Sequence, residues 1–170
     1  MQIFAELIQR LDQSNKTGDK LEVLDWFFST AAAADSVWVI AIFSDRRPKR
    51  QITTRQLRNW CQEKASIPDW LFEESYQTVG DLAETIALLL PAPTRTHSGS
   101  LTDWINWLQG LPSDEELKKQ EILTAWDQFT SLERFVFNKL ITGGFRIGVS
   151  QNLLIQALSK FAGLSQAQVA

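Results

Sequence analysis

Two junctions in this sequence combine glycine with residues that can begin a new helix. The first junction, residues 79–82, has Gly80 followed by Asp81; the second, residues 142–150, contains Gly143, Gly144, Arg146, Gly148 and Ser150. A helix N-terminus presents unpaired N–H groups and a partial positive charge, which suits a phosphate. Glycine lets the backbone approach a nucleic-acid strand closely, and an arginine can hold two phosphate oxygens or enter a narrow groove. The pattern favours anion contact; the alternative is that the glycines merely turn the chain.

A basic stretch forms a third candidate contact. Between residues 46 and 62 there are six basic residues and no acidic one: Arg46, Arg47, Lys49, Arg50, Arg55 and Arg58. Residues 134–170 also lack an acidic residue, although the whole chain has a net charge of -3. Segregated charge of this kind can give a mildly acidic protein a basic surface. Chance clustering on solvated helix faces is the alternative.

The residues of a complete catalytic site are missing from the sequence. A zinc site needs several ligands at fixed spacing, and the chain has one histidine, His97, and one cysteine, Cys61. No nucleophile motif accompanies His97, and neither a Walker-type phosphate loop nor the dinucleotide glycine pattern occurs. We interpret His97 as a solvated loop residue and Cys61 as a buried helix residue. The chain is therefore expected to contribute no catalytic residue and no metal site.

The elements that position the candidate contacts are predicted to be helices. Apolar residues recur at helical spacing, and no alternating strand with a hairpin turn is evident. Capping boxes are predicted to begin at Ser113 and at Thr130, and Ser150 is predicted to cap the helix that follows it. Residues 91–100 form a long polar loop, interpreted as a crossover within one domain. We therefore expect an all-α fold, a single compact domain over residues 1–170 with about ten helices.

Longer stretches of the sequence resemble a known family. Residues 69–76 (DWLFEESY), 79–91 (VGDLAETIALLLP) and 139–150 (KLITGGFRIGVS) are similar to the N-terminal DNA-binding domain of bacterial ATP-dependent DNA ligases. The basic stretch from Arg46 to Arg55 is similar as well. The resemblance runs in order along most of the chain, with the Gly-Asp-Leu and Arg-Ile-Gly motifs at the expected separation.

The resemblance implies an all-helical domain that lies on the minor groove of duplex DNA around a nick. Binding would use backbone amides and basic side chains, with little reading of bases. The predicted DNA-binding residues are Arg46, Arg47, Lys49, Arg50, Arg55, Gly80, Asp81, Gly143, Gly144, Arg146, Gly148 and Ser150. The family often has a second basic residue just before the matching arginine, where this chain has Phe145. At that point this chain therefore lacks the basic side chain of the family pattern.

The family's reaction needs an adenylated lysine in a Lys-X-Asp-Gly motif, which this sequence lacks. The resemblance implies that nucleotidyltransferase and OB-fold domains lie beyond residue 170, and that ATP and Mg serve the full-length enzyme. The chain itself would be the non-catalytic clamp of a ligase that seals nicks in replication, repair or recombination. Its expected partners are nicked duplex DNA and the catalytic domains of the same polypeptide; we expect a cytoplasmic monomer without membrane association.

Two other functions remain open. A helical protein-interaction module would expose its aromatic residues as an apolar patch. A helix-turn-helix regulator would use residues 54–64 as a recognition helix and would prefer one DNA sequence. No dimerisation element for such a regulator is evident in the sequence.

Overall fold

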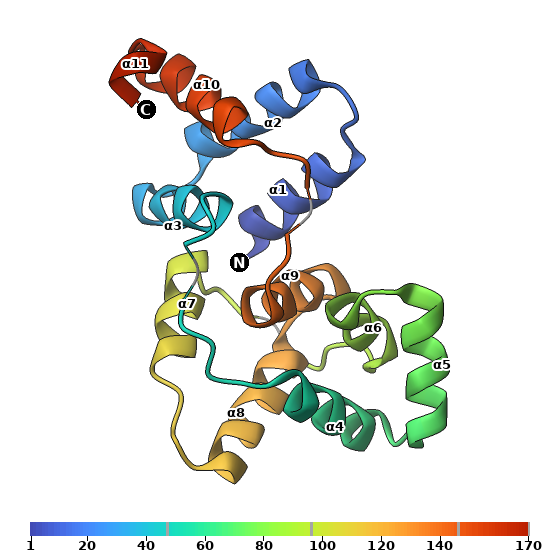
Figure 1. The fold of residues 1–170 in the computed structure, drawn as a ribbon. Helices are drawn as coiled ribbons and strands as arrows, with labels where there is room; N and C mark the ends of the chain where they lie inside the picture. The colour runs from blue at the N-terminus through green and yellow to red at the C-terminus, as the bar shows by residue number, and fades with distance from the viewer. Residues whose placement is uncertain (47, 96, 146, 170) are drawn as a thin grey trace. The chain divides into compact units, whose positions relative to one another are not determined.

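The computed structural model describes residues 1–46, 48–95, 97–145 and 147–169. These residues form eleven helices and no strand (Figure 1), which confirms the predicted all-α class. The chain packs into two compact units. The terminal unit comprises Met1–Arg47, Gly99–Asp103 and Phe145–Ala170, and the central unit comprises Pro48–Ser98 and Trp104–Gly144.

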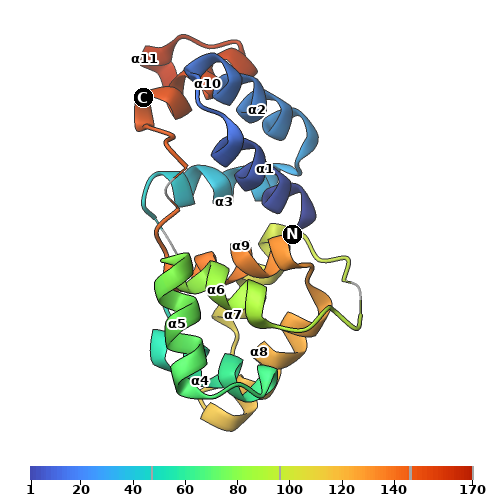
Figure 2. The ribbon, with the colours of Figure 1, turned by 90° about the vertical axis from the view of Figure 1, so that its right-hand side faces the viewer.

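The terminal unit joins helices from both ends of the sequence. Its helices are α1 (Gln2–Gln13), α2 (Thr17–Thr30), α3 (Ala33–Phe43), α10 (Gln151–Ala162) and the short α11 (Gln166–Val169). Helix α2 packs against both α1 and α10, so segments far apart in sequence lie side by side (Figures 1 and 2). The core of this unit includes Phe4, Leu11 and Phe27, none of which is more than 1% exposed.

A buried aspartate of the terminal unit caps a helix that is distant in sequence. Asp35, in the first turn of α3, is 8% exposed. Its carboxylate accepts hydrogen bonds from the N–H groups of Leu101 (3.2 Å) and Thr102 (2.9 Å), and from the Thr102 hydroxyl (2.6 Å). These two residues open α7 (Leu101–Gln109), whose first N–H groups have no partner within the helix. Asp35 therefore ties α3 to the start of α7.

The central unit carries both the first glycine junction and the basic loop. Its helices are α4 (Thr54–Ala65), α5 (Asp69–Val79), α6 (Leu82–Leu89), α8 (Glu115–Gln128) and α9 (Ser131–Thr142), together with the continuation of α7. Helix α6 packs along α9 and also against α4 and α5. A buried aromatic cluster lies in the core, where the Phe129 ring centroid is 4.6 Å from that of Trp104 and 4.9 Å from that of Phe137.

Side-chain caps fix where three of the later helices begin. The predicted capping box of Thr130 is present at the start of α9, and Ser150 caps α10 by accepting from the Leu153 N–H at 3.2 Å. The box predicted at Ser113 is wrong, because Asp114 is the N-cap of α8. Asp114 has the same capping capacity and adds a negative charge that interacts favourably with the helix dipole.

Candidate nucleic-acid interface

The first glycine junction connects α5 to α6 within the central unit. Gly80 is exposed and has a φ of +77°, in the left-handed region that favours glycine. Asp81 is the N-cap of α6, and its carboxylate accepts from the Glu84 N–H at 3.1 Å. The remaining N–H groups of the first turn have no acceptor within an α-helix. The junction therefore has an exposed glycine turn before a helix N-terminus, and anion contact there stays a prediction.

The second glycine junction begins where α9 ends. The Gly143 N–H donates to the carbonyl of Lys139 at 2.8 Å, and Gly144 follows, exposed, with a φ of +80°. A Cβ placed on Gly80 or on Gly144 would meet no atom within 4 Å. Crowding inside the protein therefore does not explain these two glycines. Their positive φ does, and it leaves an open backbone surface that another molecule can approach.

The later part of this junction belongs to the terminal unit. Gly148 is exposed, and Ser150 is the exposed N-cap of α10. The Lys20 ammonium, from α2, donates to the carbonyls of Ile147 (2.6 Å) and Gly148 (3.2 Å). Lys20 is not among the contacts predicted from the sequence, and nothing in its spacing marks it. Its position follows from the packing of α2 on α10.

A second lysine that was not predicted as a contact links the two junctions inside the central unit. Lys139 forms an ion pair with the Asp81 carboxylate, and its Nζ lies 3.4 Å from the carbonyl oxygen of Gly144. Lys139 is four residues before Gly143, one helical turn, and this spacing is the signal that could have found it. The structure thus brings Gly80-Asp81 and Gly143-Gly144 to the same lysine.

Exposed cations remain unpaired in the basic stretch. Within the described ranges, the side chains of Arg46, Lys49 and Arg55 are exposed and have no hydrogen bond or ion pair. Arg50 is also exposed; its Nε donates to the Ile52 carbonyl at 2.8 Å, and its two terminal nitrogens are unused. Arg46 belongs to the terminal unit and the other three to the central unit.

The loop that carries Lys49 and Arg50 is anchored at its C-terminal end. Gln51 donates from its side-chain amide to the carbonyl of Gln109 at 2.7 Å, and Lys118 donates to the Gln51 carbonyl at 3.3 Å. Ile52, 1% exposed, is buried in the core. An anchored loop loses less conformational entropy when its cations meet a ligand.

Other basic residues in the same stretch and in the acid-free tail are used within the fold. Arg58 pairs with Asp69 (2.7 Å) and Glu73 (2.8 Å), and its hydrogen bond to Asp69 raises the pKa of the guanidinium. Arg134 is 1% exposed and donates to three backbone carbonyls, those of Trp126 (2.7 Å), Pro91 (2.6 Å) and Leu90 (3.4 Å). Lys160 pairs with Asp25 at 3.0 Å. The described cations of the tail therefore form less of a basic surface than the composition indicates.

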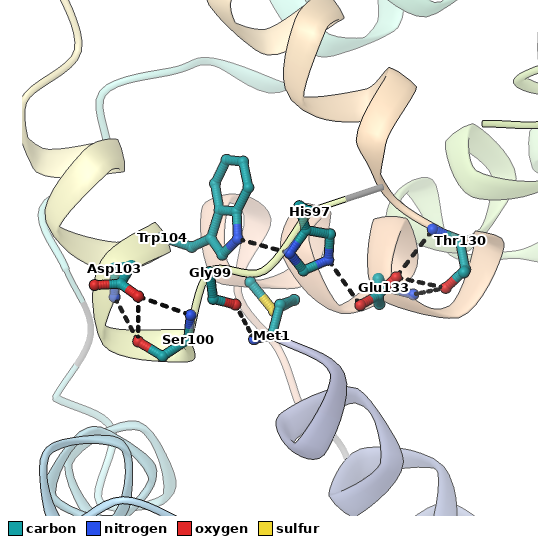
Figure 3. Close-up of polar contacts among 8 residues, drawn as sticks. All are labelled: Met1, His97, Gly99, Ser100, Asp103, Trp104, Thr130 and Glu133. Atoms are coloured by element: carbon teal, nitrogen blue, oxygen red, sulfur yellow. Dashed lines mark hydrogen bonds and ion pairs between the residues drawn. The ribbon is translucent and has the colours of Figure 1, made fainter. Parts of the chain in front are cut away.

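The interpretation of His97 as a solvated loop residue is wrong (Figure 3). Its side chain is 7% exposed, its Nε2 lies 2.8 Å from Glu133 Oε1, and the Trp104 indole N–H donates to its Nδ1 at 3.4 Å. An indole nitrogen can only donate, so Nδ1 accepts and Nε2 carries the proton given to Glu133. The ring also packs against Phe129. His97 therefore holds the polar loop to α9.

Glu133 and Cys61 complete the buried titratable groups of the central unit. Burial raises the pKa of Glu133, but hydrogen bonds from the Thr130 N–H and hydroxyl and from His97 outweigh it and hold that pKa below its ordinary value. Cys61 is fully buried in α4, as predicted, and burial raises the pKa of its thiol to about 12. The thiol thus stays protonated and unreactive at neutral pH.

Two predicted contacts, Arg47 and Arg146, lie outside the described residues. In the part of the chain that is described, no three His, Cys, Asp or Glu side chains are grouped to hold a metal ion. The helices found there are also too short or too polar to cross a bilayer.

Comparison with known proteins assigns the chain to a family. A search of curated proteins found no match. A family model described as DNA ligase N terminus matches residues 1–159, a range that takes in residues of both units and both glycine junctions. The chain belongs to the family of N-terminal domains of ATP-dependent DNA ligases.

Proposed function

We propose that this chain binds duplex DNA through the phosphate backbone, from the minor-groove side and with little dependence on base sequence. Family membership supports a ligase-associated DNA-binding role. The main support for binding through the phosphate backbone is a set of exposed cations in the basic stretch that have no ion pair within the described residues: Arg46, Lys49, Arg50 and Arg55. Charges of this kind neutralise phosphates and release counterions, which supplies most of the affinity of non-specific DNA binding.

The glycine junctions support backbone contact over base reading. At Gly80 and Gly144 the surface is main chain without a Cβ, and each junction precedes a helix N-terminus. Backbone N–H groups of this kind bind phosphate oxygens and position a protein on DNA without reading its sequence. The clamp would therefore be set on the duplex by geometry and charge, which suits an enzyme that must act at nicks of any sequence.

Helix α4 gives little support to a helix-turn-helix reader. Three of its charged side chains pair with neighbouring helices of the central unit: Arg58 with Asp69 (2.7 Å), Glu63 with Lys119 (2.7 Å) and Lys64 with Asp127 (2.8 Å). A recognition helix needs several such side chains free to reach base edges. The one arginine that α4 leaves unpaired within the described structure, Arg55, is better suited to a phosphate.

In this proposal the chemistry of nick sealing belongs to other domains of the same polypeptide. The sequence has no Lys-X-Asp-Gly motif, so the adenylated lysine, ATP and Mg are assigned to nucleotidyltransferase and OB-fold domains. The present chain would act as a monomeric clamp in the cytoplasm that holds nicked duplex for them during replication, repair or recombination.

Fluorescence anisotropy with a labelled nicked duplex tests the proposal. About 4–6 phosphate contacts predict a log–log salt slope of roughly -4 to -5. Affinity should be the same for duplexes of unrelated sequence. No binding at micromolar protein and low salt would contradict DNA binding, and a strong preference for one sequence would favour the regulator.

One observation favours the protein-interaction alternative. A groove of about 340 Å³ lies between α5 and α6, lined by Val79, Leu88 and Leu89 among others, and Leu88 is 62% exposed. Under the DNA-binding proposal, Leu88→Glu should leave the anisotropy titration unchanged. A flat DNA titration, together with salt-insensitive binding of an apolar probe that Leu88→Glu abolishes, would favour a protein partner.

A further inference from the structure

Asp81 presents an electrostatic problem at the first glycine junction. A carboxylate beside a surface that receives phosphates repels them, and the side chain of Asp81 is 32% exposed. The capping role alone does not require a charge, because asparagine caps a helix as well as aspartate does. Some other property of the carboxylate must therefore account for its place there.

The ion pair with Lys139 supplies that property. One carboxylate oxygen of Asp81 caps α6 and the other pairs with the Lys139 ammonium, so the charge is neutralised where phosphate would approach. The Lys139 side chain is 12% exposed, which limits its own access to a ligand. Lys139 is thus placed better to act through its neighbours than to contact DNA itself.

Lys139 also frames the turn of the second junction. Its backbone carbonyl accepts from the Gly143 N–H at 2.8 Å, and its ammonium lies 3.4 Å from the Gly144 carbonyl. The backbone of α9 beside Lys139 is held by separate contacts. The neighbouring Asn138 accepts from the Trp126 indole N–H at 2.9 Å and donates to the Ala83 carbonyl at 3.4 Å. One lysine therefore contacts Asp81 and Gly144 from a part of α9 that is hydrogen-bonded to its neighbours.

We propose that Lys139 is a positioning residue for DNA binding: through Asp81 and the Gly144 carbonyl it holds the two glycine turns in the arrangement that the DNA backbone meets. The inference rests on the proposed function. It assigns Gly80-Asp81 and Gly143-Gly144 to one binding surface of the central unit, and gives the acidic residue in the Gly-Asp-Leu motif a purpose other than phosphate contact.

Asp81→Asn separates positioning from simple electrostatics. The variant keeps the cap of α6 and removes one negative charge, so electrostatics alone predicts tighter DNA binding. Positioning predicts weaker binding, by about fivefold, the size expected for a partly exposed ion pair. Binding equal to or tighter than wild type would overturn the inference. The matched control is Glu63→Gln, which breaks an ion pair between α4 and α8, with Lys119, and should not weaken binding.

Lys139→Met completes the test. Its affinity should fall by a similar factor of about five with the salt slope unchanged, whereas removing a lysine that binds a phosphate directly would lower the slope magnitude by about 0.9. The double variant should bind no more weakly than either single variant, because both break the same bridge. Lys139→Arg keeps the charge and should bind within about twofold of wild type.

The two failures can be told apart in one data set. A wild-type chain that binds no DNA refutes the proposed function. A wild-type chain that binds, alongside an Asp81→Asn variant that binds at least as well, refutes only the positioning role. Circular dichroism melts establish that each variant is folded at the temperature of the titration, so that a drop in affinity is not an unfolding effect.

Discussion

The basic stretch and the acid-free tail look alike in sequence but differ in what their cations do. In the stretch from residue 46 to 58, four arginines and lysines are exposed with charged nitrogens unused by other described residues. In the tail, Arg134 is buried, Lys139 pairs with Asp81 and Lys160 pairs with Asp25. A charge count along the chain therefore does not measure the charge that a partner meets.

The largest effect is expected on the free energy of unfolding, at the buried Arg134 of the tail. Arg134→Met should lower the free energy of unfolding by about 3 kcal/mol, because three backbone carbonyls lose their donor at about 1 kcal/mol each. Urea denaturation measures this destabilisation. The affinity of the folded variant for DNA should stay close to wild type, and a selective drop in DNA affinity without destabilisation would break the comparison.

The basic stretch should respond in the opposite way. Replacing Lys49, Arg50 and Arg55 by glutamine should reduce the magnitude of the salt slope by up to about 2.7, at about 0.9 for each phosphate that is no longer neutralised. The free energy of unfolding should change by no more than about 0.5 kcal/mol, as is usual for exposed side chains. An unchanged salt slope in anisotropy titrations would show that these cations face no phosphate.

Glu133 immediately precedes the acid-free tail. The pH dependence of its contribution to stability tests whether this part of α9 serves the fold. Its pKa is held below the ordinary value, so its contribution is present at neutral pH and is lost as the pH falls through the lowered pKa. Glu133→Gln should lower the free energy of unfolding at pH 7 and flatten the loss of stability that wild type shows as the pH falls below the ordinary glutamate pKa. The exposed Glu115→Gln is the control; equal profiles for both variants would contradict a framework role for Glu133.

The smallest effect is expected at Lys160. It lies in α10 and is paired with Asp25, and its side chain is 60% exposed. Lys160→Met should change DNA affinity by less than about twofold and stability by less than about 0.5 kcal/mol. A drop in affinity as large as that of Arg55→Gln would show that the tail also presents a basic surface.

Helix positions and several caps were predictable because they depend on local sequence. Thr130 and Ser150 cap the helices that they precede, and Gly143 ends α9 with a positive φ. What the side chains meet was not predictable, because it depends on tertiary packing. From sequence alone Arg134 looks like a surface charge, but in the fold it donates to the carbonyls of Trp126 and Pro91. His97 looks like a solvated loop residue, but in the fold it is bonded to Trp104 and Glu133.

The same limit applies to the candidate interface. Glycine spacing located the two junctions, since a turn between helices is a local property. The helical spacing of Lys139 from Gly143 is visible in the sequence, but its ion pair with Asp81 is not. The approach of Lys20 to the second junction is not visible either, because it depends on how the helices pack.

The most direct test of DNA binding by this chain is an NMR titration of the ¹⁵N-labelled protein with a short nicked duplex. We predict amide shifts concentrated in three segments, residues 48–55, 80–83 and 143–151, with little change around Lys160 or along the α5–α6 groove. Shifts confined to that groove, or absent altogether at low salt, would contradict DNA binding by the basic stretch and the glycine junctions.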